Sequence, residues 1–138
     1  MAKFNDHGQV ATEYLLLIGF LLAIVGVASA YALFFYNESF KVSEAKNTVT
    51  LMAETADQVY AWGPGNALTV SVTVPAGVQE ICVHGHLVRL KLSMAGSDNY
   101  ATGVTIPKLT PNCTLPTAEG RYVLRVAVVD NNVTFTEV

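Results

Sequence analysis

The feature that most constrains this chain is an apolar run from Tyr14 to Tyr36, which a lone carboxylate, Glu13, opens. The about 23 residues of the run would rise about 34 Å as an α-helix, enough to cross about 30 Å of hydrocarbon. A carboxylate costs about 2.5 to 3.5 kcal/mol at the middle of a membrane and less at its edge. An acid at the head of such a segment is therefore a functional hypothesis that needs a partner.

The composition narrows the class of protein. The chain has 138 residues, of which 51% are hydrophobic and 14% charged, and its net charge is −3. This predicts one domain plus a membrane segment. Lys and Arg never cluster, so the charge pattern does not favour nucleic-acid binding. There is no nucleophile elbow and no phosphate-binding loop, and we expect neither an enzyme nor a cofactor.

The helical pattern continues beyond the apolar run. No proline occurs before Pro64, and a second apolar stripe has alternating spacings of three and four: Val42, Ala45, Val49, Met52, Ala56 and Val59. Gly63-Pro64-Gly65 then ends the pattern. We predict one helix over residues 9–62, in which 14–36 is the membrane or filament-core segment. Trp62 is expected in the core, at the junction with the next domain.

After Gly65 the period changes to two, which predicts strands in residues 66–138. Apolar residues alternate with hydroxyl residues over 68–74, and further strands are expected around 80–83, 87–92, 103–106, 121–129 and 133–138. Asp130-Asn131 favours a tight hairpin, and Gly85, between His84 and His86, favours a turn over a pair of metal-binding histidines. Residues 94–102 and 108–120 are predicted loops. The predicted fold class is α+β: a long N-terminal hydrophobic α-helix followed by a small antiparallel β-sandwich.

Two cysteines and three glycosylation sequons all follow the apolar run. We expect a disulfide between Cys82 and Cys113, which would close about 32 residues and add roughly 3 to 4 kcal/mol to a domain this small. Two buried free thiols are the alternative. The sequons, which are candidate glycosylation sites, are at Asn37, Asn112 and Asn132. Together these marks favour an extracellular β domain.

The segment Gly8-Gln9-Val10-Ala11-Thr12-Glu13-Tyr14 resembles the class III signal peptide of archaeal type IV pilins. In that family a prepilin peptidase cuts after the glycine, and the pattern Gln-x-Ser-x-Glu-Tyr precedes the apolar helix. Gln9, Glu13 and Tyr14 match this pattern, while Ala11 stands in place of the serine. The resemblance covers the leader and the helix. The β domain is similar to such pilins only in the general character of its sequence.

The resemblance implies a lollipop-shaped structural subunit. Residues 1–8 would be removed at the Gly8–Gln9 bond, and the subunit would wait in the cell membrane. An ATPase-driven platform would then assemble identical subunits into an adhesive surface pilus, with the apolar helices bundled inside. The new ammonium of Gln9 would meet the Glu13 carboxylate of a neighbour. Small residues on one helix face would allow this bundling: Gly19, Ala23, Gly26 and Ala30.

Two other interpretations stay open. Ala28-Ser29-Ala30 fits the small-x-small site of signal peptidase I, and cleavage there would release a secreted β module that begins at Tyr31. Alternatively, the chain stays uncut as a membrane-anchored binding module. A plain anchor does not need Glu13, which is why the pilin is preferred; the alternative explanation of Glu13 is a flanking charge at the headgroup level, where acids are tolerated.

Overall fold

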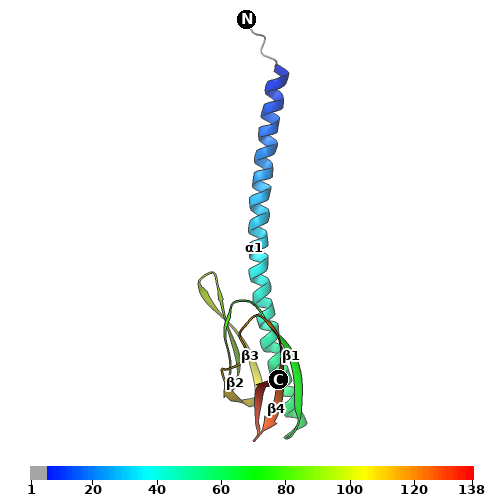
Figure 1. Ribbon diagram of the computed structural model, residues 1–138, viewed down its shortest axis with the longest axis vertical. Coiled ribbons are helices and arrows are strands. Elements are labelled where there is room, and N and C mark those ends of the chain that lie inside the picture. Colours follow the sequence, from blue (N-terminus) through cyan, green and yellow to red (C-terminus); the bar gives the residue numbers. More distant parts are fainter. Residues whose placement is uncertain (1–5) are drawn as a thin grey trace. The chain divides into compact units, whose positions relative to one another are not determined.

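The computed structural model describes residues 6–138, and their side chains from Val10 onward. The elements are a helix, α1 (Asp6–Trp62), and five strands: β1 (Ala67–Val74), β2 (Val78–Met94), β3 (Ser97–Asn112), β4 (Gly120–Val129) and β5 (Asn132–Glu137) (Figure 1). The α+β class, with a long apolar N-terminal helix and a mostly antiparallel sheet, is confirmed. The predicted leader and the cleavage site at Gly8 and Gln9 lie outside the described side chains.

The chain divides into two compact units, one up to Asn37 and one from Glu38 to Val138. Since α1 runs through this division, its last part belongs to the same unit as the sheet. The predicted apolar stripe is buried in that unit at Ala45, Val49, Met52, Ala56 and Val59. Val42, at the start of the stripe, is 43% exposed. The second half of the helix is therefore part of the core of the β domain.

The helix ends at Trp62, where Gly63 takes a positive φ of 90° and donates its N–H to the Tyr60 carbonyl at 3.0 Å. The Asn66 amide also donates to the Trp62 carbonyl at 2.7 Å. The prediction that Trp62 is a core residue is wrong, because its side chain is 51% exposed. The alternating spacing of the buried stripe reaches position 63 after Val59, so Trp62 lies off the buried face.

The five strands form one sheet in the order β1-β4-β5-β3-β2. Neighbouring strands are antiparallel, except that β3 and β5 pair in parallel at Leu109 and Val133. The predicted sandwich needs two sheets. Here a single sheet curls instead, and the buried stripe of α1 fills its concave side. This follows because helix residues and strand residues belong to the same buried apolar cluster.

The curl depends on β2, which reverses direction in its middle. The N–H of Ser93 donates to the carbonyl of Gly77 at 3.0 Å, although a straight strand would separate these residues by about 50 Å. Gly85, midway between them, takes a φ of 60°, and the pairing with β3 shifts on both sides of it. The chain therefore bends back at Gly85 within one strand: the segments before and after Gly85 both pair with β3, with irregular pairing at the bend, and no separate turn divides them as predicted.

The helix closes the curled sheet by contacting both β1 and the first half of β3. The Thr48 hydroxyl donates to the Thr73 carbonyl of β1 at 2.5 Å, and the Asp57 carboxylate accepts the Ile106 N–H of β3 at 2.8 Å. At Gly103 the approach is closest, since a Cβ there would lie 2.7 Å from the Val49 carbonyl oxygen. The second half of α1 is thereby fixed to two strands that are not neighbours in the sheet.

Two predicted loops are partly strand. Residues 94–102 contain a two-residue turn at Ala95-Gly96, after which β3 starts at Ser97, and residues 108–112 belong to the end of β3. The start of β3 is polar and does not show the alternation typical of a strand. It pairs with β2, and a Lys91–Asp98 ion pair of 2.9 Å joins the two strands. The Arg89 guanidinium also lies 5.6 Å from the Tyr100 ring centre. The predicted Asp130-Asn131 hairpin is confirmed, with φ angles of 48° and 64°.

Candidate assembly site

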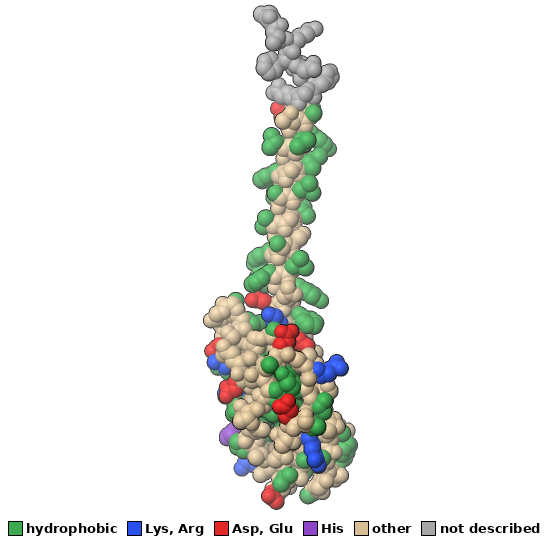
Figure 2. All heavy atoms as spheres, in the orientation of Figure 1, with side chains coloured by type: hydrophobic (Ala, Val, Ile, Leu, Met, Phe, Trp, Pro, Cys, Tyr) green, Lys and Arg blue, Asp and Glu red, His purple; other side chains and the backbone are tan. Residues whose placement is uncertain are grey.

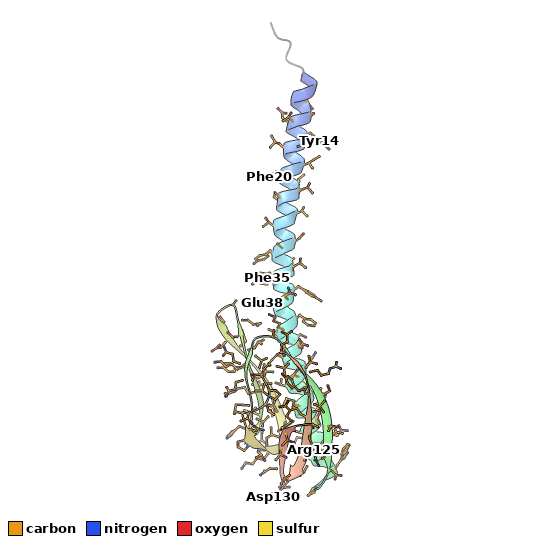
Figure 3. The ribbon with its side chains drawn as sticks, in the orientation of Figure 1. Tyr14, Phe20, Phe35, Glu38, Arg125 and Asp130 are labelled. Carbon is orange, nitrogen blue, oxygen red and sulfur yellow. A yellow bond between two sulfur atoms is a disulfide. The ribbon has the colours of Figure 1, made fainter. Side chains whose placement is uncertain are left out.

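The first compact unit is a helical segment whose side chains are all exposed from Val10 to Asn37. Its surface is hydrophobic along its length (Figure 2), and Tyr14, Phe20 and Phe35 point outward from α1 (Figure 3). From Val10 onward α1 is long and apolar enough to cross a membrane. Burying one large apolar side chain gains about 1.5 to 3 kcal/mol, so this segment has a strong tendency to enter lipid or to pack against other chains.

The predicted small residues share one face of this segment, since their spacings of four, three and four residues match the helical period: Gly19, Ala23, Gly26 and Ala30. A Cβ built on Gly19 or on Gly26 would have no atom within 4 Å. A glycine inside a helix costs about 0.5 to 1 kcal/mol relative to alanine. No atom of the described residues uses the space that these glycines leave, which fits close packing against a helix of another molecule.

Glu13 lies exposed at the head of the apolar segment. Among the side chains of residues 10–138, it has no cationic partner; the ion pair found there is Lys91–Asp98. Gln9, its proposed partner from a neighbouring subunit, is outside the described side chains. The pairing of Glu13 with a new amino terminus stays a prediction.

The other end of the apolar segment is aromatic. Phe35 packs against Tyr31 at 4.6 Å and against Phe34 at 6.4 Å between ring centres. Between the two ends, the Ser29 hydroxyl donates to the Val25 carbonyl at 2.8 Å. That hydroxyl is thus satisfied within the helix, as a lipid or a dry helix bundle requires.

The predicted disulfide is present. Cys82, on β2, is bonded to Cys113, just after β3, and their Cα atoms are 4.2 Å apart. Glu80 lies close enough to complete a set of three potential metal ligands. The two sulfurs are bonded to each other and offer no thiolate, so this set does not form a metal site. The disulfide instead links β2, near its bend at Gly85, to the residue that follows β3. Such bonds are typical of an extracellular environment.

The His84-Gly85-His86 segment lies at the bend of β2. The His86 Nδ1 is 3.1 Å from the carbonyl oxygens of both Ile106 and Pro107, so a proton on that nitrogen is donated to the facing part of β3. His84 is exposed. The predicted turn is wrong in form, because His84 and His86 lie within the strand β2 on either side of the bend at Gly85.

The three sequons differ in their surroundings. Asn37 is exposed on α1, and Asn132 is partly buried at the start of β5. The Asn112 Nδ2, the atom that a glycan would occupy, donates to the Phe135 carbonyl at 3.1 Å. Its Oδ1 accepts the N–H of Thr114 at 2.9 Å. All three stay predictions as glycosylation sites, but Asn112 is already engaged in the fold.

The cations of the sheet lie outside the core. Arg89, Arg121 and Arg125 are exposed and Lys91 is partly exposed. The hydrogen bond that the Lys91 ammonium donates to the Asp98 carboxylate raises the pKa of Lys91 above its usual value. Two residues that position the helix, Gly103 and Asp57, were missed from the sequence. An isolated glycine within a predicted strand is the signal that could have found the first, because it marks a close backbone approach.

No protein-family model, curated protein or solved structure matches this chain. Its class therefore rests on its own features. A long apolar N-terminal helix precedes a disulfide-linked β domain, which fits a pilin-like or a membrane-anchored extracellular module.

Proposed function

We propose that this protein is a structural subunit, a pilin, of an archaeal type IV-like adhesive pilus. It is processed after Gly8 and polymerises through its hydrophobic N-terminal helix, with other copies of itself as partners. A prepilin peptidase and an assembly platform act on the membrane-held form before the filament reaches the cell surface. The role is structural, without catalysis or a cofactor.

The observation that carries this proposal is the combination of an acid and a fully exposed apolar helix in one segment. An ordinary anchor needs the apolar surface but not the carboxylate, which costs free energy near hydrocarbon. Cleavage after Gly8 would create an ammonium on Gln9, one helical turn before Glu13. In a bundle of parallel helices, the ammonium of one subunit and the Glu13 carboxylate of the next would neutralise each other and fix the stagger between them.

The alternative is an anchored or secreted β module, and the length of the apolar helix favours the anchored form. Mass spectrometry of the mature chain separates the cases. A chain that starts at Gln9 supports the pilin, one that starts at Tyr31 supports secretion, and an intact leader supports an anchor. Sheared surface fractions add a second readout, because a pilin is released as long filaments while an anchored module stays with the membranes.

The Glu13→Gln substitution tests the mechanism of assembly. A hydrogen bond to a charged group contributes about 1.5 to 3 kcal/mol, so we expect subunit association to weaken by roughly tenfold to a hundredfold. The measurement compares the amount of filament with the amount of correctly processed subunit. Glu38→Gln, at the other end of the apolar segment, is the matched control and should assemble normally. Processed Glu13→Gln subunit that makes a normal amount of filament would contradict the proposed pairing.

A further inference from the structure

We propose a second contact between copies of this protein, made by the β-domain unit. The exposed face of the last turns of α1, called the helix face here, would bind the outer surface of β4 in the next copy. The helix face consists of Asn47, Leu51, Glu54, Gln58 and Trp62. The β4 surface consists of Arg121, Val123 and Arg125. This contact rests on the proposed function, because filament assembly is what brings the two copies together.

The helix face is exposed and anionic. Its residues recur at spacings of three and four, on the side of α1 opposite the buried stripe, and all five are exposed. Two of them are large and apolar: Leu51 is 40% exposed and Trp62 51%. No Lys or Arg occurs from position 47 to the end of the helix, so no cation of this part of α1 offsets the charge of Glu54 or the negative end of the helix dipole.

The nearest other acid is already engaged in the fold. Asp57 is only partly exposed, and its carboxylate accepts the Ile106 N–H at 2.8 Å. Glu54 has no partner of this kind among the residues that the structure describes. The Glu54 carboxylate is therefore available to bind a cation of another molecule.

The β4 surface is cationic. Arg121, Val123 and Arg125 alternate on the outer side of β4, opposite its buried residues, and Val123 is 44% exposed. Their neighbours in the pairing with β1 are Thr73, Ser71 and Thr69. These neighbours carry hydroxyl groups and no charge, and neither arginine forms an ion pair within residues 10–138. Figure 3 labels Arg125 among the side chains of the sheet.

The two surfaces match in spacing as well as in charge. Arg121 and Arg125 are four residues apart on a strand, which separates their Cα atoms by about 13 Å. Glu54 and Trp62 are eight residues apart on a helix, which gives a rise of about 12 Å. One arginine can therefore pair with Glu54 while the other stacks on the Trp62 ring, an arrangement that guanidinium groups favour. Val123 would then face the middle of the helix face.

A contact between two different surfaces has a consequence for assembly. A surface that binds its own copy closes a dimer, whereas a head-to-tail contact repeats and can continue as a helical filament. The contact is small and would be weak between free subunits. Packing of the apolar helices would hold neighbouring units at a high effective concentration, so a weak contact still adds stability to the filament.

Zero-length cross-linking of sheared filaments tests the contact directly. The variant with both Arg121→Lys and Arg125→Lys keeps the charges and provides amines, and a carbodiimide joins carboxylates to amines that touch. We expect a covalent dimer in which Glu54 is linked to Lys at 121 or 125. The same variant with Glu54→Gln is the control and should lose that linked peptide. Filaments that yield no such peptide would overturn the contact.

Charge reversal gives an independent test. Glu54→Arg should lower the filament yield several-fold, and adding Arg121→Glu and Arg125→Glu to the same chain should restore it. Glu119→Arg, which reverses an exposed acid in a loop, is the matched control and should leave the yield unchanged. Normal yield from Glu54→Arg would reject the contact while leaving the pilin intact, whereas an absence of filaments from the unaltered chain would reject the pilin itself. A chain that carries only Arg121→Glu and Arg125→Glu gives a third result. If this chain assembles normally but is no longer retained on heparin beads, the β4 surface binds acidic polysaccharide, and the contact is overturned.

Discussion

The substitution Gly103→Ala tests how closely the helix lies against β3. The added Cβ would be 2.7 Å from the Val49 carbonyl oxygen and 3.2 Å from the Ala53 Cβ. The nearer atom belongs to the backbone, so it cannot turn away, and the helix and the strand must separate. Overpacking of this kind costs about 1 to 3 kcal/mol, and the reduced entropy of the unfolded chain offsets about 0.4 to 1 kcal/mol.

The expected net loss is about 1 to 2 kcal/mol in the free energy of unfolding. For a unit of about 100 residues, this corresponds to a decrease in Tm of about 4 to 16 °C. The measurement is thermal unfolding of the detergent-solubilised full chain with its disulfide intact, followed by the fluorescence of Trp62. Gly19→Ala, where a Cβ meets no atom within 4 Å, is the matched control and should leave this transition unchanged.

A double variant separates the two contacts. Gly103→Ala combined with Ala53→Gly removes the contact between the two Cβ atoms but keeps the contact with the Val49 oxygen. We therefore expect no recovery of Tm, and the glycine placed inside the helix should cost about a further 0.5 to 1 kcal/mol. If Gly103→Ala unfolds at the same temperature as the unaltered chain, then α1 does not lie on β3 at this distance, and the account of how the helix closes the sheet is refuted.

Two further predictions concern the stability of the β domain. Replacing Cys82 and Cys113 together by serine should lower the free energy of unfolding by about 3 to 4 kcal/mol in the chain-entropy view, measured as a lower urea midpoint; an unchanged midpoint would contradict a stabilising staple. Met52→Ala, at a position with 0% exposure, should cost about 2 to 5 kcal/mol in the same assay, because it leaves a cavity. Leu51→Ala, one residue earlier and 40% exposed, should cost about 1 kcal/mol or less, and equal losses at the two positions would refute the assignment of the buried helix face.

Local patterns were enough for much of the fold. The spacing of Ala45, Val49 and Val59 identified the buried stripe, because a helix brings such positions to one face whatever lies against them. The hairpin at Asp130-Asn131 was predictable for a similar reason, since these residue types tolerate a positive φ. For the assembly segment, the sequence supplied the apolar run, the acid and the small-residue face, which depend only on the helical period.

The errors have different origins. The start of β3 is polar and was predicted as a loop; it is a strand because β2 lies beside it and supplies both the hydrogen bonds and the charge partner of Asp98. Trp62 was predicted in the core because it is large and apolar, but its place on the helix turns it away from the buried stripe. For β3 a contact between segments decided the outcome, whereas for Trp62 the helical period itself places the side chain off the buried stripe.

The sequence by itself determined a long apolar helix headed by Glu13, a change to strands after Gly65, and the pair of cysteines that forms the disulfide. These follow from periodicity and from the limited chemistry of the residues involved. Only the tertiary structure decided that Gly85 bends a single strand, that the sheet curls around the second half of α1, and that Gly103 admits the helix. The physical reason is that such features depend on the distance between segments far apart in the chain, which no local pattern encodes.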